Sequence, residues 1–434
     1  MQVDSNLKLF MRYASLNVLG MIGLSCYILA DTFFVAQGVG PNGLTALNLA
    51  LPVYSVIHGT GLMIGMGGAT RFSISKSGSI FTRSLLYGWC VAIVYLLCGI
   101  FLSGALATAL GADTQVHEYT KTYLQILLLF SPLFLTNNIL NCFVRNDNDP
   151  RLSMIAMLAG TFTNIVFDYI FVFPCNLGIG GAALATGFSP LISICILSTH
   201  FLSKKNNLKF KKAALKVREF IKSVKDISAL GIAALITELS SGIVLIVFNN
   251  LILRLEGNLG VAAYGIIANI AIVVTSIFTG IAEGSQPIIS RSYGEGRLKD
   301  ANKILRYGII SAVAFAAVFY ITSFIFTEPI VKLFDSEGSR ELIDMAVHGF
   351  RIYFLSAFFL GINIQVASYF TSIDRAGNGF IISLCRGFAV IVPVSILMSF
   401  ILGLDGVWLS LCISELIVCG IGAWRLRRER LCRQ

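Results

Sequence analysis

Apolar residues follow one another in long runs along this chain, instead of recurring on one side of a helix or alternating with polar ones. Many runs have the length of roughly 20 residues at which an α-helix crosses the hydrocarbon core of a bilayer. The strands of a membrane β-barrel would show short alternating segments instead. The pattern predicts an all-α polytopic membrane protein. We predict twelve spans, at residues 13–36, 44–69, 84–108, 120–142, 152–174, 180–201, 227–252, 259–288, 304–326, 345–370, 378–402 and 405–424.

Composition supports this class of protein. The 434 residues are 56% hydrophobic and 13% charged, with a mean hydropathy of +0.79, whereas soluble domains carry about 25% charged residues. The long hydrophilic stretch 203–226 lies near the middle of the chain. We therefore predict an N-terminal lobe (residues 1–202), a basic cytoplasmic linker (203–226) and a C-terminal lobe that ends in a basic cytoplasmic tail (227–434).

The basic residues set the expected orientation. Most of the 33 lysines and arginines fall on one side of the predicted topology, with the linker and the tail. Cytoplasmic loops are enriched in these residues, so we expect both termini to be cytoplasmic and the protein to lie in the cell membrane. The net charge of +10 then reflects topology and attraction to the anionic lipids of the bilayer, and we expect no nucleic-acid partner.

An internal repeat divides the chain into two similar halves. The segment around span 2, "NGLTALNLALPVYSVIHGTG", resembles the segment around span 8, "LGVAAYGIIANIAIVVTSIF", so that Gly43 matches Gly260 and Ser73 matches Ser290. Each half holds six spans, an even number, so both insert with the same orientation. The predicted fold is therefore two six-helix lobes related by a pseudo-two-fold axis along the membrane normal, as in parallel-repeat transporters.

Three motifs stand in the order and spacing of a known family. They are "ADTFFVAQ" at the end of span 1, "TNIVFDYIFVF" in span 5 and "GSQPIISRSYGEGR" at the end of span 8. With the twelve spans, they make the whole chain resemble the MATE (multidrug and toxic compound extrusion) transporters, and the segment 43–68 resembles the bacterial MepA and DinF branches. The resemblance implies secondary active efflux, in which organic, often cationic, compounds leave by alternating access against inward flow of H⁺ or Na⁺. It implies no enzymatic activity and no cofactor besides the coupling ion, and we expect a functional monomer.

Two aspartates lie deep within otherwise apolar spans. A charge there costs several kcal/mol, with estimates from roughly 2.5 upward. At about 1.5 Å per residue, Asp31 and Asp168 both fall in the outer half of the bilayer, and Asn164 and Thr186 reach a similar depth. Two nearby carboxylates cannot both ionise cheaply, and such an oxygen-rich set also suits a small hard cation such as Na⁺. The resemblance assigns these four positions to a cation-coupling site. In the alternative interpretation, the aspartates are hydrated near the interface or cap helix ends.

Other side chains suit the binding of flat, lipophilic cations, which favours aromatic and methionine surface. The resemblance implies that five positions line a substrate cavity in the N-terminal lobe; the alternative is that they face lipid or pack between helices. The five are Tyr27, Asn137, Asn138, Met157 and Thr161.

Glu238 lies close to the midplane of span 7. In the NorM branch of the family a glutamate at this position binds a cation together with an aspartate of span 10. Here span 10 contains Asn363 and Gln365 but no acid. Glu238 could bind an ion, meet a cationic substrate or pair with Arg386. His58, in span 2, is either a proton-relay residue or a histidine that hydrogen-bonds a neighbouring helix.

Two other functions fit less well. A lipid-linked oligosaccharide flippase shares the two-lobed architecture, but such proteins have a strongly cationic cavity and often extra spans. An integral membrane enzyme would need a cluster of His, Asp, Ser or Cys at an interface, whereas the four histidines are dispersed and no Walker or metal motif occurs.

Overall fold

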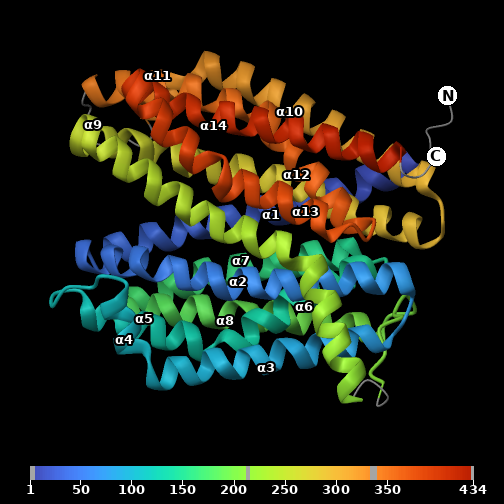
Figure 1. The fold of residues 1–434 in the computed structure, drawn as a ribbon. Helices are drawn as coiled ribbons and strands as arrows, with labels where there is room; N and C mark the ends of the chain where they lie inside the picture. Colours follow the sequence, from blue (N-terminus) through green and yellow to red (C-terminus); the bar gives the residue numbers. More distant parts are fainter. Residues whose placement is uncertain (1–4, 212–215, 333–339, 432–434) are drawn as a thin grey trace. The chain divides into compact units, whose positions relative to one another are not determined.

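The computed structural model describes residues 5–211, 216–332 and 340–431. Throughout these ranges the regular structure is helical and contains no strand (Figure 1). Residues 212–215 of the predicted linker and 432–434 of the predicted tail lie outside the described residues. The elements are α1 (Ser5–Gly38), α2 (Pro41–Ser75), α3 (Ser79–Phe101), α4 (Ser103–Ala109), α5 (His117–Leu129), α6 (Ser131–Asn146), α7 (Pro150–Val172), α8 (Gly178–Ser198), η1 (Thr199–Leu202), α9 (Val217–Gly294), α10 (Leu298–Lys332), α11 (Arg340–Tyr353), η3 (Phe354–Ser356), α12 (Ala357–Ser372), α13 (Ala376–Leu384), the π-helical turn η4 (Cys385–Ala389) and α14 (Ile391–Leu431).

The helices account for all twelve predicted spans. In the described part of the chain, nine helical stretches are long and apolar enough to cross a membrane, and the bent pair α5–α6 makes ten. Two of these stretches consist of two helices that meet at a glycine with non-helical φ/ψ: α9 at Gly257, and the stretch from α13 to α14 at Gly403. Each therefore contains two spans, and the prediction of twelve membrane-crossing helices is confirmed.

Four glycines with positive φ lie at matching positions in the two halves of the internal repeat. Gly40 (φ 84°) separates α1 from α2, and Gly257 (φ 65°), which breaks α9, stands at the spacing that relates Gly43 to Gly260. Gly178 (φ 55°) and Gly403 (φ 59°) hold corresponding positions before the last span of each half. Because a side chain is strained at such φ values, these glycines show that the two halves share turns as well as sequence.

The described residues form two compact units. The unit that we call the N-terminal unit comprises Ser15–Leu239 and Ser290–Gly296, and the C-terminal unit comprises Met1–Ala14, Ser240–Ile289 and Arg297–Gln434. Each has its own hydrophobic core, built around α2, α3, α5, α6 and α8 in the first and around α9, α10, α12 and α14 in the second. Large apolar side chains such as Phe162 and Phe400 remain exposed, as a lipid-facing surface requires.

Glycines bring α2 close to the first half of α9 inside the N-terminal unit. A Cβ atom on Gly67 would lie 2.1 Å from the carbonyl oxygen of Ile227, and one on Gly231 would lie 1.8 Å from that of Met63. Neither position can hold a larger residue without moving a backbone. Small residues allow such close contact between membrane helices, and here they fix which side chains of α2 and α9 meet.

Candidate functional site

The four predicted coupling residues come together inside the N-terminal unit. Asp31 projects from α1, Asn164 and Asp168 from α7, and Thr186 from α8, and all four are buried. Asp31 is 7% exposed and Asp168 is not exposed at all. The two carboxylates are close enough to interact electrostatically. The packing of α1, α7 and α8 thus places two acids in one site.

Asn164 joins the two halves of this site. With its amide oriented to satisfy both neighbours, it donates from Nδ2 to Asp168 Oδ2 (3.2 Å) and accepts from the backbone N–H of Thr186 (3.3 Å). Asn164 precedes Asp168 by one helical turn, so both side chains leave the same face of α7. The amide therefore links the middle of α8 to the acid on α7.

A tyrosine completes the surroundings of the acid pair. Tyr123 of α5 is buried and lies within the electrostatic reach of both Asp31 and Asp168. This tyrosine was not predicted from the sequence. Tyr123 lies only three residues inside predicted span 4, where a tyrosine is more simply explained as an interfacial residue.

The carboxylates leave oxygen atoms without donors. Among the described residues, neither Asp31 Oδ1 nor Asp168 Oδ1 has a hydrogen-bond partner, although both atoms are buried. A buried polar atom without a partner costs about 1–3 kcal/mol, and more when the group is charged. A proton or a small cation would supply what these atoms lack. No group of three or more His, Cys, Asp or Glu is placed to hold a metal in the described ranges, so Asn164 and Thr186 would have to complete the oxygen ligands of a cation.

The predicted substrate-binding residues have different surroundings. The hydroxyls of Tyr27 and Tyr54 share a hydrogen bond of 2.5 Å, so Tyr27 joins α1 to α2 one turn before Asp31. Asn138 donates to the carbonyl oxygen of His58 (3.3 Å), which ties α6 to α2. Asn137 Oδ1, in contrast, is buried without a partner among the described residues.

Met157 and Thr161 face helix α1. A Cβ atom on Gly20 would lie 3.0 Å from Met157 Sδ, and one on Gly23 would lie 3.7 Å from Thr161 Oγ1. Both side chains are partly buried. They therefore pack where α7 crosses α1, on the face of α7 that also carries Asn164 and Asp168.

Glu238 pairs with a histidine of α2. His58 Nδ1 lies 3.5 Å from Glu238 Oε2, where the glycines of α2 bring α9 into contact. Arg386, the partner suggested by the sequence, donates from Nε to Glu415 Oε1 instead (2.8 Å). The interpretation of a pair between Glu238 and Arg386 is therefore wrong.

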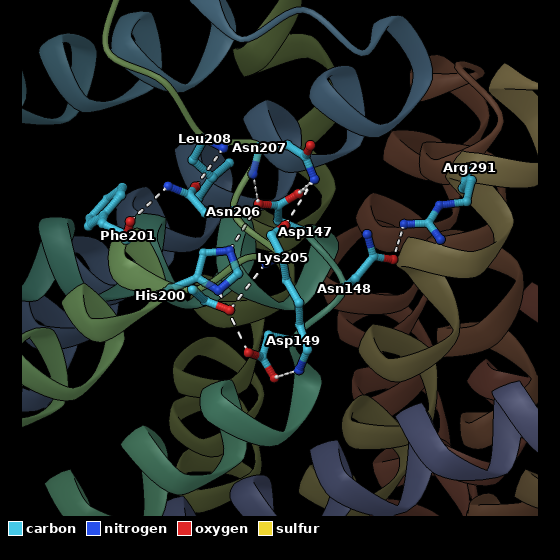
Figure 2. Close-up of polar contacts among 11 residues, drawn as sticks. Asp147, Asn148, Asp149, His200, Phe201, Lys205, Asn206, Asn207, Leu208 and Arg291 are labelled. Carbon is cyan, nitrogen blue, oxygen red and sulfur yellow. Dashed lines mark hydrogen bonds and ion pairs between the residues drawn. The ribbon is translucent and has the colours of Figure 1, made fainter.

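A second polar cluster of the N-terminal unit surrounds His200 (Figure 2). This fully buried histidine lies between two acids of the α6–α7 loop, with Nε2 2.9 Å from Asp147 Oδ2 and Nδ1 3.7 Å from Asp149 Oδ2. Asn207 donates its backbone N–H to Asp147 (2.7 Å), and Lys205 pairs with Asp149 (3.2 Å). These contacts fasten the first part of the predicted linker to the bundle, and they serve no role in the acid site.

These features define a polytopic helical membrane protein with a buried pair of acids. The family model described as MatE matches residues 18–170 and 231–416, and the chain belongs to this family. It is 28% identical over 442 residues to the multidrug export protein MepA of Staphylococcus aureus (strain MSSA476), covering 98% of this chain and 94% of that protein. It is 26% identical over 438 residues to the protein of the same name from Staphylococcus saprophyticus, covering 99% and 95%.

A solved structure shows the same fold. It is described as the outward-facing conformation of a multidrug resistance MATE family transporter of the MOP superfamily. It matches with a TM-score of 0.91 at 23% identity, over 99% of this chain and 97% of that one. The predicted resemblance to MATE transporters is thus confirmed for the family and for the fold.

Proposed function

We propose that the protein is a cation-coupled multidrug exporter, which moves organic, often cationic, compounds outward by alternating access in exchange for inward flow of H⁺ or Na⁺. The family and the relatives named as multidrug export proteins support export. The buried pair Asp31 and Asp168, with two carboxylate oxygens that lack donors, carries the proposal for coupling.

The acid pair links ion binding to helix packing. With both carboxylates ionised, two like charges share a buried site, which is unfavourable. A proton or Na⁺ relieves this repulsion and draws the side chains of α1, α7 and α8 together. The packing that is stable with the ion therefore differs from the packing that is stable without it. Coupling requires that the ion and the substrate favour different packings, because a ligand shifts an equilibrium only by its difference in affinity for the two states.

Substrate binding is proposed on the neighbouring surface of the same unit. Tyr27 and Thr161 lie on the faces of α1 and α7 that carry the acids, and Met157 adds a polarisable thioether. Asn137 offers a buried carbonyl oxygen without a partner, and Glu238 offers a negative charge. An organic cation bound here would compete with the coupling ion for the negative charge of the site.

Efflux of ethidium from vesicles containing the purified protein tests the coupling site. We expect Asp31→Asn and Asp168→Asn each to abolish efflux driven by an imposed pH or Na⁺ gradient, while both proteins still insert into the membrane. Asp405→Asn is the matched control, since Asp405 is exposed and pairs with His348. Wild-type efflux by either buried-site variant would remove the acid pair from the mechanism, and separate pH and Na⁺ gradients identify the ion.

We propose further that the protein acts as a monomer in the cell membrane, with both termini in the cytoplasm. The distribution of lysine and arginine supports this orientation. Labelling of single cysteines placed near residue 8 and residue 425 with a membrane-impermeant reagent tests it: we expect labelling only after the membrane has been opened.

A further inference from the structure

We propose that His58 and a cationic substrate compete for the carboxylate of Glu238, so that protonation of His58 releases the substrate from this charge. The inference rests on the proposed function and adds a second charge-controlled position to the transport pathway, separate from the acid pair. It follows from the contact between His58 and Glu238 and from their connection to Asp31.

His58 and Glu238 lie close to each other, and both side chains remain partly exposed. His58 Nδ1 lies 3.5 Å from Glu238 Oε2, which is near enough for an ion pair when the imidazole is protonated. The side chain of His58 is 13% exposed and that of Glu238 is 34% exposed. We expect an ion pair with a purely structural role between membrane helices to be fully enclosed. A carboxylate that is partly accessible can exchange one cationic partner for another. Glu238 is therefore placed to bind either the imidazolium or a cation that reaches it from the accessible side.

The backbone holds the two residues at this distance. A Cβ atom on Gly59, the neighbour of His58, would lie 3.0 Å from Glu238 Cβ. On the other side, Asn138 of α6 donates to the carbonyl oxygen of His58 (3.3 Å). The backbone around His58 thus packs closely against both α9 and α6, so we expect a change in the charge of His58 to act on Glu238 without a large movement.

Aromatic residues connect this pair with the acid site. The ring of Tyr54 stacks on His58, with ring centroids 5.6 Å apart and an interplanar angle of 12°. The Tyr54 hydroxyl shares a hydrogen bond with Tyr27, which precedes Asp31 by one turn. Tyr54 lies within the electrostatic reach of both Glu238 and Asp31. The titratable groups that these contacts link to His58 are thus Glu238 on α9, Tyr54 on α2 and, through Tyr54, Tyr27 and Asp31 on α1.

The direction of the effect follows from the charges. Histidine changes its charge closer to neutral pH than any other side chain. At low pH the imidazolium neutralises Glu238, and an organic cation loses its counter-charge. At high pH the neutral imidazole leaves Glu238 free to attract the cation. Affinity for a permanent cation should therefore rise with pH, by at least about fivefold for the loss of one opposite charge at contact distance.

Equilibrium binding of tetraphenylphosphonium to the purified protein between pH 5.5 and pH 8.5 tests the proposal, since the charge of this probe does not depend on pH. We expect His58→Asn to keep the high affinity at low pH and to reduce the pH dependence. We expect His58→Lys to bind weakly throughout, because a lasting positive charge occupies Glu238. Glu238→Gln should bind weakly at high pH, and adding His58→Asn to it should change nothing further.

His348→Asn is the matched control, because His348 also faces a carboxylate, that of Asp405 at 2.8 Å, but is exposed in the C-terminal unit. This variant should bind like the wild-type protein. Equal pH dependence in the wild-type protein and in His58→Asn, with probe binding intact, would overturn this inference and leave the proposed exporter function standing. Failure of the wild-type protein to bind the probe at any pH would overturn both.

Discussion

The contribution of the buried ion pair Arg386–Glu415 of the C-terminal unit to the free energy of unfolding can be tested quantitatively. Glu415 of α14 is 2% exposed, and it accepts from Arg386 Nε (2.8 Å) and from Asn363 Nδ2 (2.7 Å). We expect Arg386→Leu to be strongly destabilising, since it leaves a buried carboxylate without its counter-charge. Removing one partner of a buried pair costs about 3–5 kcal/mol. Because Asn363 remains as a donor, we expect a value near the lower limit, about 3 kcal/mol.

The double variant Arg386→Leu/Glu415→Leu should recover most of this loss. No charge is then buried, and Asn363 Nδ2 keeps an acceptor, the backbone carbonyl at position 415 (2.8 Å). Unfolding of the purified protein in mixed micelles with increasing dodecyl sulfate measures both free energies. Ethidium efflux should persist in the double variant, because the proposed coupling site lies in the N-terminal unit. A single variant as stable as the wild-type protein would refute the buried pair, and loss of efflux in a stable double variant would refute its purely structural role.

Two further substitutions test the packing of the N-terminal unit. Gly231→Ala would place a Cβ atom 1.8 Å from the carbonyl oxygen of Met63, so we expect the free energy of unfolding to fall by about 1–3 kcal/mol. Gly242→Ala is the control: its Cβ atom would meet open space, and we expect little change in the same unfolding assay. His200→Phe removes the imidazole that contacts Asp147 Oδ2. We expect the free energy of unfolding to fall by about 1–3 kcal/mol and proteases to cleave the linker after residue 203 faster. Unchanged cleavage would contradict the anchoring role of His200.

The helices were predictable because their sequence signal depends only on the chain itself. Run length decides whether a segment can cross a bilayer, and this property does not depend on its neighbours. For Asp31 and Asp168, whose depth in the bilayer stays a prediction, counting residues along a straight helix gives a similar height. It could not give the direction in which each side chain points, and the packing of α1, α7 and α8 had to supply that.

The contacts between helices were not predictable. Whether His58 meets Glu238 depends on how closely α2 approaches α9, and backbone contact at Gly67 and Gly231 decides this distance. The role of Asn138 depends on the approach of α2 to α6 at Gly61, because its amide donates to a backbone carbonyl of α2. The sequence does not show which helix packs against the glycines of α2.

The two halves of the chain share backbone turns, but the acid site of the N-terminal half has no counterpart among the described residues of the C-terminal half. The spacing that relates Gly40 to Gly257 relates Asp31 to Phe248, a fully buried side chain in the core of the C-terminal unit. A buried carboxylate of that unit, Glu415, pairs with Arg386, whose guanidinium already supplies the positive charge that an ion would bring. A pair that carries its own counter-charge is not stabilised further by a cation. The acid pair of the N-terminal unit lacks a counter-charge among the described residues, so a proton or a cation would stabilise it. This asymmetry supports placing the proposed coupling ion in the N-terminal unit.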